Sequence, residues 1–440
     1  MIQKAADKKA RAQVVDLLLH TAAAIGITTD RELAELCDVS PDNIAHWKSG
    51  ASQELKTQTM ALLKERLAAR LTSLRERARD GTHEGLVALE IEEGSGPASL
   101  QRDLAERLRY DYLGHRFLYF EPQGALAWES LMRGGYDQSC WLAGVDSCAR
   151  AFVDDGGAFS GALGLNKKGA IKGLDVISLG PGEAGKEAIL LKHLVARGQS
   201  LPWLGCALVD VSIPLLLTAA TTCRAVCKDF ERASVLPFCA DFEDGRLAFM
   251  QRLQSTHRPS MATRLVLMLG NVFGNVRDEQ VLVEERLLRM LRPGDLLWLE
   301  VALRFDKIEN DPLFRMTVGG DPEHQDSAPE AARRLLLEGP YRRCEAATGR
   351  KPSEIQTRVW VRTDDESCPV PGSFNFCHDL VIKDERRACT MLYSRRYDVD
   401  GLVSFLKRHG LDVEAWCPSP TPHGATASRT CWLVDGSLPA

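Results

Sequence analysis

Residues 174–194 read LDVISLGPGEAGKEAILLKHL. The first six are a short, largely apolar run with strand character, and the glycine-rich residues after them predict a sharp turn. An amphipathic helix is expected to begin near Ala184. A strand, a glycine turn and a helix in this order form the entry to a nucleotide-type cofactor site in open α/β folds. Gly180 and Gly182 lack a Cβ atom, so the backbone can turn tightly and a ligand can lie against it.

This stretch alone leaves other interpretations open. Its G-x-G-x-x-G spacing also suits a nicotinamide dinucleotide, and a glycine turn can simply pack a helix onto a sheet. A dehydrogenase would usually need a second βαβαβ unit for the other half of the dinucleotide, and the sequence gives no sign of one. The residues that follow the other predicted strands favour a cofactor site.

Length and composition narrow the class of protein. The 440 residues, 45% hydrophobic and 26% charged, suffice for two or three domains with buried cores. The net charge of −5 gives no reason to expect a polyanion as a partner of the whole chain. The 13 cysteines are scattered, without a C-x-x-C pair or a zinc-type spacing, so we expect reduced thiols and no metal site. With no signal peptide and no apolar run of ~18 residues, the sequence predicts a cytoplasmic protein without a membrane span.

The first 80 residues predict an all-helical domain. Short helices are expected at 12–25, 31–37 and 42–49, and a long charged helix at 53–79. The leucines of the long helix have near-heptad spacing, so it could pair with itself in a homodimer or pack on the next domain. Residues 29–50, TDRELAELCDVSPDNIAHWKSG, resemble the helix-turn-helix of lambdoid phage repressors.

Such a motif presents the start of its second helix to the major groove of DNA. The DNA-binding candidates are therefore Asn43, His46 and Lys48, and Asn43 could read adenine. Residues 1–80 carry 13 Lys and Arg against 11 Asp and Glu, a net charge of +2, which is little for binding driven by counterion release. Two roles stay open, namely DNA contact, and docking or dimerisation through a helical module.

From residue 174 onward, predicted strands and helices alternate. Further strands are expected at 205–211, 234–242, 264–269 and 296–303, and helices at 212–227 and 279–291. Repeated βα units predict a parallel, doubly wound sheet. Ligands of such sheets lie across the carboxyl ends of the strands.

Chemically informative residues follow the strands at that edge. Asp210 ends the second strand, and its carboxylate suits the two hydroxyl groups of a ribose. Asp241 and Phe242 end the third strand, where a carboxylate can accept from the amino group of adenine and a ring can cover its face. Asn271 and Asn275 follow the fourth strand. This layout resembles that of the class I S-adenosylmethionine-dependent methyltransferases.

The resemblance extends to the histidine-specific methyltransferases of ergothioneine biosynthesis over about residues 113–435. The matching motifs are an aromatic-Tyr-x-x-x-G segment at 117–124, a glycine turn closed by Lys186, V-D-V-S at 209–212, D-F-E at 241–243 and L-G-x-x-x-G-N at 269–275. Near the C-terminus, a strand at 393–397 and a helix at 401–416 resemble the closing elements of the family.

The resemblance implies a role for each matching residue. S-adenosylmethionine (SAM) would be held by Tyr119, Gly180, Gly182, Lys186, Asp210, Asp241, Phe242 and Asn271. The methyl acceptor would lie against Gly270, Asn275 and Ser394. Tyr119 and Tyr136 are the candidates for a catalytic hydrogen bond to an amine nucleophile.

The chain departs from this family where the family recognises imidazole. The family's glutamate aligns with Leu392, its tyrosine-rich segment is absent apart from Tyr136 as a loose counterpart, and Pro181 replaces a small polar residue. A leucine would leave an imidazole nitrogen unpaired, at a cost of about 1–3 kcal/mol. The sequence therefore predicts N-methylation of an amino acid-like, peptide or other amine rather than of free histidine.

The expected organisation has four parts. They are a helical helix-turn-helix domain (1–80), a linker (81–112), a class I methyltransferase core with a Rossmann-like doubly wound sheet (113–304) and a smaller α+β substrate lobe with the C-terminal strands (305–440). The alternative functions are a regulator that senses a ligand without turnover and binds DNA or a partner protein, and a component docked in a larger assembly.

Overall fold

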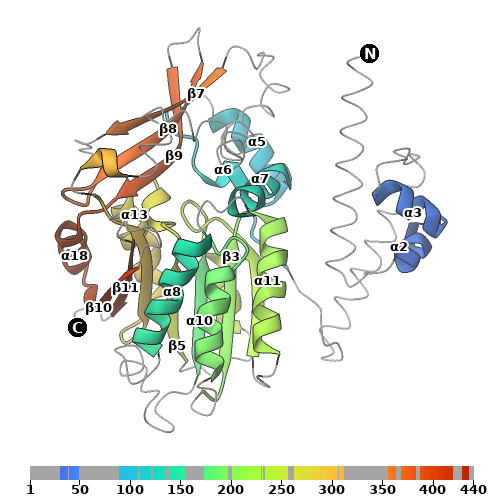
Figure 1. Ribbon diagram of the computed structural model, residues 1–440, viewed down its shortest axis with the longest axis horizontal. Coiled ribbons are helices and arrows are strands. Elements are labelled where there is room, and N and C mark those ends of the chain that lie inside the picture. Colours follow the sequence, from blue (N-terminus) through green and yellow to red (C-terminus); the bar gives the residue numbers. More distant parts are fainter. Residues whose placement is uncertain are drawn as a thin grey trace. The chain divides into compact units, whose positions relative to one another are not determined.

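The computed structural model describes a defined set of residues (Figure 1). They are residues 30–37, 39–48, 89–107, 110–119, 122–133, 138–153, 173–196, 201–228, 230, 233–255, 262–305, 307–311, 355–362, 368–382, 387–419 and 429–435. The chain divides into two compact units, Met1–Ala88 and Leu89–Ala440.

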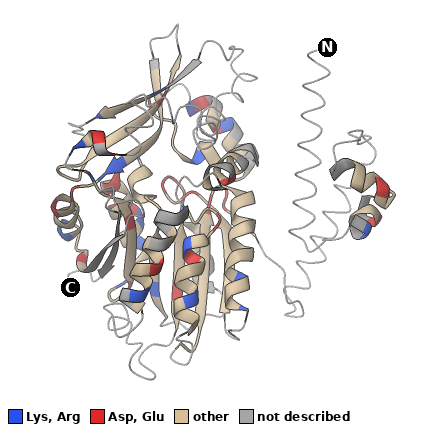
Figure 2. Cartoon of the chain, in the orientation of Figure 1, with Lys and Arg blue, Asp and Glu red and all other residues tan. Residues whose placement is uncertain are grey.

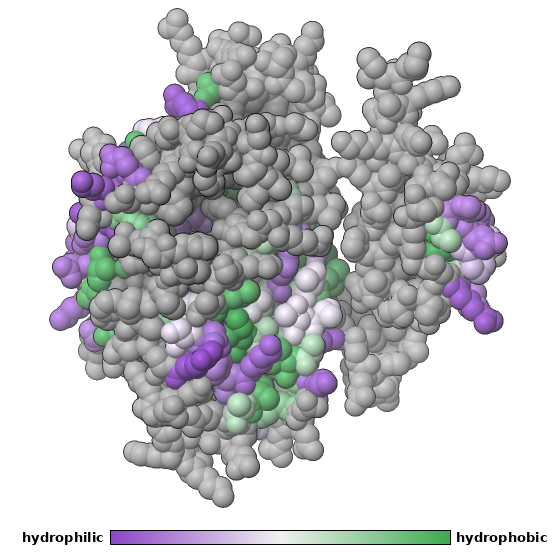
Figure 3. Space-filling view, viewed as in Figure 1, coloured by the Kyte–Doolittle hydropathy of each residue, from purple (hydrophilic) through white to green (hydrophobic). Residues whose placement is uncertain are grey.

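The described part of the first unit is a pair of short helices, α2 (Asp30–Cys37) and α3 (Pro41–Lys48). Ile44 of α3 is fully buried, as are Leu33 and Ala34 of α2. The face of the pair that Figure 3 shows is mainly hydrophilic. The helices expected at 12–25 and 53–79 lie outside the described residues.

The second unit is built on an eight-stranded sheet in the order β1-β4-β3-β2-β5-β6-β11-β10. Its strands are β1 (Glu90–Ile91), β2 (Leu174–Leu179), β3 (Leu204–Asp210), β4 (Ala233–Cys239), β5 (Thr263–Met268), β6 (Leu296–Ala302), β10 (Asp412–Ser419) and β11 (Arg429–Asp435). The first six strands in the order are parallel, whereas β11 is antiparallel to β6 and β10. Every residue of β2, β3 and β6 is buried, as expected for strands covered by helices on both faces.

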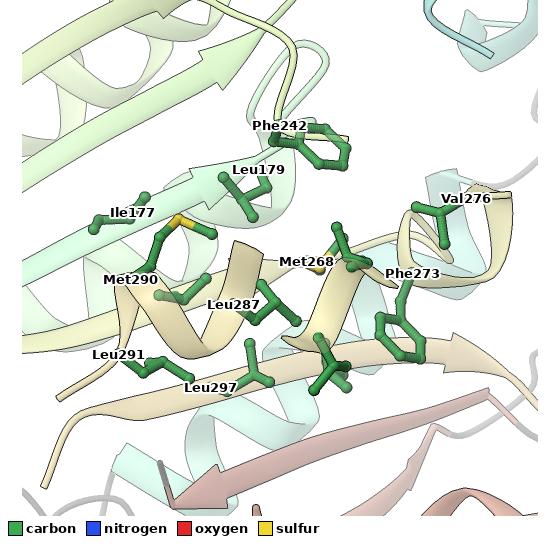
Figure 4. Packing of buried hydrophobic residues seen from close by; sticks show 14 of the residues in the cluster. Ile177, Leu179, Phe242, Met268, Phe273, Val276, Leu287, Met290, Leu291 and Leu297 are labelled. Atoms are coloured by element: carbon green, nitrogen blue, oxygen red, sulfur yellow. The ribbon is translucent and has the colours of Figure 1, made fainter. Parts of the chain in front are cut away.

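Helices cover both faces of this sheet (Figure 1). One face carries α8 (Gln138–Val153), α10 (Gly185–Ala196) and α11 (Ile213–Cys227). The other carries α12 (Ala248–Ser255), a continuous helical stretch from α13 (Glu279–Leu282) through η3 (Val283–Leu287) to α14 (Leu288–Met290), and α18 (Val399–Arg408). Figure 4 shows the core on this second face, where Leu287 and Met290 pack on side chains from β2, β5 and β6.

A second sheet, β7-β8-β9, is an antiparallel meander of β7 (Ile355–Arg362), β8 (Phe374–Ile382) and β9 (Arg387–Arg396). The start of β9 joins the segment before α6, because Leu113 N donates to Thr390 O at 2.8 Å. Just past its end, Tyr397 N donates to Ala302 O at 2.9 Å, so β9 also joins the end of β6. These contacts attach the second sheet at the carboxyl edge of the first.

The described part of the second unit also contains three helices and two single turns. They are α5 (Pro97–Arg107), α6 (Arg116–Tyr119), α7 (Pro122–Arg133), η2 (Phe273–Asn275) and η4 (Ile308–Asn310). Together with β1, α5 lies in the segment expected to be a linker.

The doubly wound sheet is confirmed, and one local prediction is wrong. Gly124 lies inside α7, where a Cβ atom would stand 1.9 Å from Leu118 O, so glycine permits the close approach of α6. The helix expected at 401–416 ends at Arg408, and residues 412–419 form β10. Gly410, with φ of 74°, turns the chain after that helix.

Candidate functional site

The order of the strands reverses beside β2, which lies between β3 and β5. After β2 the chain crosses to one face of the sheet, and after β5 it crosses to the other face. Ligands of such sheets bind in the crevice between the loops that follow these two strands. The loops after β2, β3, β4 and β5 meet at this carboxyl edge, and acidic residues mark several of them in Figure 2. Most of the residues predicted for the cofactor lie on these loops.

The glycine turn after β2 has the backbone conformation that its sequence predicts. Gly180 and Gly182 have φ values of 68° and 57°, in the region that glycine adopts without strain. A Cβ atom on Gly182 would stand 3.2 Å from Nε1 of Trp128, and one on Gly180 would stand 3.2 Å from the Val272 side chain. The turn is therefore a narrow cradle in which backbone faces side chains from α7 and from the loop after β5.

Asp210, at the end of β3, faces this turn. One carboxylate oxygen accepts from Ser212 N at 2.9 Å and the other from Gly182 N at 3.4 Å. Burial raises the pKa of Asp210 to about 6, although these backbone hydrogen bonds act in the opposite direction. A buried carboxylate at the end of β3, the strand next to β4, suits the hydroxyl groups of a sugar.

Asp241 and Phe242 follow β4 on the neighbouring loop. Oδ1 of Asp241 accepts from the backbone N–H groups of Glu243 at 2.9 Å and Asp244 at 3.2 Å. Its Oδ2 accepts from Nη1 of Arg116 at 2.5 Å. The Phe242 ring approaches Gly180 from the side, 3.7 Å from the position of a Cβ atom there. The structure thus brings the predicted adenine residues next to the glycine turn.

Two further predicted cofactor residues, Tyr119 and Lys186, also reach this region. Tyr119, at the end of α6, makes an edge-on contact with the Trp128 ring, with 5.6 Å between ring centroids. Lys186 is the second residue of α10, and its Nζ would lie 2.1 Å from a Cβ atom on Gly270. Only glycine at 270 leaves room for this lysine in its present position.

Asn271 has a role in the structure that its sequence position did not predict. It is one of three non-glycine residues with positive φ in the described part of the chain, at 64°. Its Oδ1 accepts from Ala302 N at 2.9 Å, and its Nδ2 donates to Arg395 O at 3.4 Å. The amide therefore links the ends of β6 and β9, and a contact to the cofactor stays a prediction.

The predicted acceptor residues Asn275 and Ser394 lie on two segments that one buried network holds together. Asn275 ends the turn η2 (Phe273–Asn275), and Ser394 lies near the end of β9. Arg395, fully buried, pairs through Nε with Glu279 Oε1 at 3.0 Å and donates to Val276 O and to Arg277 O. The chain immediately after Asn275 is thus hydrogen-bonded to the residue immediately after Ser394.

The buried pair has a third member. Tyr397 OH donates to Glu279 Oε1 at 2.6 Å. Burial raises the pKa of Glu279, while Arg395 and Tyr397 act to lower it. The hydroxyl of Ser394 accepts from Nη1 of Arg396 at 2.9 Å, and Arg396 in turn pairs with Asp311.

Several functional candidates were absent from the sequence prediction. His115 and Arg116 precede and begin α6, and they pair with carboxylates on the loop after β4. Burial lowers the pKa of His115, but the hydrogen bond to Glu243 and the charges of three nearby carboxylates outweigh it, so the pKa is raised. Trp128 lies over the glycine turn. The only available sequence signal was their position in the segment that also contains Tyr119.

The other predicted residues lie either outside the described residues or on α3 of the first unit. Tyr136 and the side chain of Lys48 lie outside the described residues. Asn43 and His46 are exposed on α3. Among the residues that the structure describes, no group of three or more potential ligands could hold a metal ion. No helix in the described ranges has the length and apolarity needed to cross a membrane.

Comparison with known proteins identifies the chemistry of the core. Residues 165–307 match the family model described as histidine-specific methyltransferase, SAM-dependent. The match runs from just before β2 to just after β6 and so contains all four loops of the edge described above. This core is that of a SAM-dependent methyltransferase. Its cofactor is S-adenosylmethionine, and the sheet has the class I, Rossmann-like arrangement.

Three methyltransferases are among the solved structures that match the chain at low identity. One from Clostridium acetobutylicum ATCC 824 is 11% identical, with 72% of this chain and 98% of that chain covered and a TM-score of 0.33. The glycopeptide N-methyltransferase MtfA with sinefungin is 15% identical, with coverage of 73% and 98% and a TM-score of 0.30. A family 2 O-methyltransferase from Planctomyces limnophilus DSM 3776, in complex with apigenin, is 13% identical, with coverage of 77% and 66% and a TM-score of 0.35. None of the curated proteins compared with the sequence matches it.

Proposed function

We propose that this methyltransferase transfers the methyl group of SAM to the neutral nitrogen of an amino acid-like, peptide or other small amine, and not to free histidine. One observation carries the proposal. The glycine turn, the Asp210 carboxylate and the Asp241–Phe242 pair converge where the strand order reverses, and the acceptor candidates lie on the adjoining loop and on β9.

For the cofactor, the residues present fit the group. The positive φ values of Gly180 and Gly182 and the narrow space above them support a ligand lying against bare backbone. Asp210 would accept from the ribose hydroxyls, and Asp241 and Phe242 would contact adenine. Lys186, Tyr119 and Asn271 complete the proposed cofactor set. When bound, SAM supplies a methyl group that its sulfonium already activates.

For the acceptor, we assign Gly270, Asn275 and Ser394. The buried Arg395 side chain, next to Ser394, donates to the backbone just after Asn275, and this supports a fixed relative position of the two residues. An in-line transfer needs such positioning, because positioning supplies most of the acceleration. Tyr119 would hydrogen-bond the incoming amine, and Tyr136 has the same proposed role. The amine must arrive unprotonated, since only its lone pair can attack the methyl group.

The exclusion of free histidine rests on Leu392. This side chain is partly buried and packs against the same apolar cluster as Tyr119 and Trp128. The resembling family has a glutamate at this position, where a carboxylate would pair with an imidazole nitrogen. A leucine leaves that nitrogen unpaired, which costs about 1–3 kcal/mol.

The test combines binding with product analysis. SAM is titrated into the full chain by calorimetry, and the same sample is then analysed for S-adenosylhomocysteine after addition of histidine or of a panel of amino acids, peptides and amines. We expect binding, turnover with an amine from the panel and none with histidine. Asp210→Ala should abolish binding. Turnover with histidine alone would contradict the proposed acceptor, and binding without turnover on any amine would favour a sensor.

The roles proposed for residues 1–80 need separate measurements. DNA contact through Asn43, His46 and Lys48 predicts that the full chain binds duplex DNA with an affinity that falls steeply with salt. Docking or dimerisation predicts a change in native mass, either of the chain alone or with a protein partner. The proposed compartment is the cytoplasm, where the buried free thiols such as Cys206 and Cys223 would stay reduced.

A further inference from the structure

The segment that leads into α6 contributes two adjacent side chains, an arginine and a histidine, to the loop after β4. Nη1 of Arg116 lies 2.5 Å from Asp241 Oδ2, and Nδ1 of His115 lies 3.4 Å from Glu243 Oε2. The side chains of Arg116 and Asp241 are only 12% and 7% exposed. An ion pair so well shielded from water holds its geometry far better than a surface pair does.

The Asp241 carboxylate is constrained at both oxygens. Its Oδ1 accepts from two backbone N–H groups of its own loop, and its Oδ2 accepts from Arg116. An ionised carboxylate offers about four acceptor positions, so these three bonds leave about one, on Oδ2. That oxygen is the one which Arg116 orients.

Arg116 is itself held from two sides. Its Nη2 lies 3.8 Å from Asp103 on α5 and 4.0 Å from Asp244, both of which are about half exposed. Its guanidinium also lies 4.7 Å from the centroid of the Phe117 ring, which is fully buried. The arginine is thus anchored independently of any ligand.

We infer that Arg116 is a positioning residue for adenine recognition, in that it directs the one remaining acceptor position of Asp241 toward the 6-amino group of the cofactor. The inference rests on the proposed contact between Asp241 and adenine. This recognition is specific for an amino group. A carboxylate in this orientation accepts a hydrogen bond from an amino group and forms none with a ring that carries hydrogen at that position. His115 supports the same loop, and its ring lies 6.1 Å from that of Phe242.

The test uses two ligands and the full chain. They are S-adenosylhomocysteine and its analogue in which hydrogen replaces the 6-amino group, each titrated by calorimetry. The wild type should prefer the amino form by about tenfold or more, the worth of one hydrogen bond to a charged acceptor. Arg116→Gln should weaken the amino form and reduce the preference to below about threefold, while Arg116→Lys should restore part of it. Asp241→Asn should also remove most of the preference.

Arg102→Gln is the matched control, because it makes the same substitution at an exposed arginine of α5 whose Nη2 donates to Ser99 and not to Asp241. It should leave the preference unchanged, and thermal unfolding of each variant checks that it is folded. A preference retained in Arg116→Gln would overturn the role of Arg116 alone. Binding of both ligands equally by the wild type would overturn the adenine contact of Asp241 and the inference with it. If the wild type bound neither ligand, the proposed cofactor site itself would be wrong.

Discussion

Asn271 and Ala302 are joined by a hydrogen bond of 2.9 Å from the backbone N–H of Ala302 to the side-chain oxygen of Asn271. The same side chain donates to Arg395 O, so one amide connects the loop after β5 to both sheets. Asn271 itself has φ of 64°, a conformation that asparagine tolerates better than most residues. In the proposed site, the hydrogen bonds of one side chain therefore join the loop after β5 to β6 and to β9, which is distant in sequence.

Asn271→Gly should lower the free energy of unfolding by about 1–3 kcal/mol, because two buried backbone groups lose their partner while glycine keeps the backbone conformation. Asn271→Ala should cost about 1 kcal/mol more, since its Cβ atom is strained at positive φ. Chemical denaturation measures both. Because Asn271 belongs to the proposed cofactor set, each variant should also weaken SAM binding, by about tenfold for the loss of one hydrogen bond. Unchanged SAM affinity in a stable Asn271→Gly would contradict the proposed contact between this amide and the cofactor.

Asp210 should make cofactor binding depend on pH. Its pKa is raised by burial to about 6, and the ionised form is the one that accepts from ribose hydroxyls. The Kd for SAM should therefore rise about tenfold for each pH unit below about 6 and be constant above it. Calorimetry between about pH 5 and 8 measures this, and Asp210→Asn should bind weakly without that dependence. A wild-type profile flat across this range would contradict the proposal.

The Asp210 carboxyl group should also make the stability of the cofactor-free protein depend on pH, in the direction opposite to that of SAM binding. In the cofactor-free protein, the folded state holds this proton more tightly than the unfolded state, whose pKa is 3.8. The stabilisation is complete below 3.8 and is lost as the pH rises through about 6. The difference in unfolding free energy between wild type and Asp210→Asn should therefore change across this window, as denaturation at several pH values would measure.

Removing one member of the buried Arg395–Glu279 pair should destabilise the protein severely. Arg395→Met would leave the Glu279 carboxylate buried without its cation, and we expect a loss of about 3–5 kcal/mol. The double variant Arg395→Met, Glu279→Gln should recover much of that loss, because the uncompensated charge is gone. A double-mutant cycle by chemical denaturation tests this, and additive losses would mean that the two residues act independently.

Leu392→Glu should change acceptor recognition. Restoring a carboxylate at this position should allow the enzyme to bind histidine, with an affinity at least about tenfold above that of the wild type. Leu392→Gln is the matched control, since it has the same size without the charge. Calorimetry with histidine in the presence of S-adenosylhomocysteine measures the gain. Equal histidine affinity in wild type and Leu392→Glu would indicate that this side chain does not face the acceptor.

Local sequence was sufficient to predict the doubly wound core. Buried parallel strands need continuous apolar residues, and β2, β3 and β5 each show such a run in the sequence. The turn after β2 needs positive φ, and its glycines indicate this. The position of Asp210 also follows from the chain itself, because the residue that ends a parallel strand lies at the carboxyl edge of the sheet.

The rest depended on contacts between residues distant in sequence. Residues 412–416 belong to the helix predicted at 401–416, yet residues 412–419 form β10, because pairing with β11 and termination of α18 near Gly410 outweigh local propensity. The helix α8 gave few local signals and forms by packing on α10.

The partners of individual side chains were the least predictable part of the site. Arg116 and Asp241 are separated by 125 positions in the chain, and Asn271 and Arg395 by 124. Sequence alone determined which residue types stand at the ends of the strands and hence the class of cofactor. Only the tertiary structure decided which side-chain oxygens and amides of these residues already have hydrogen-bond partners. The partner of a side chain depends on how separate elements pack together and not on the residues beside it in sequence.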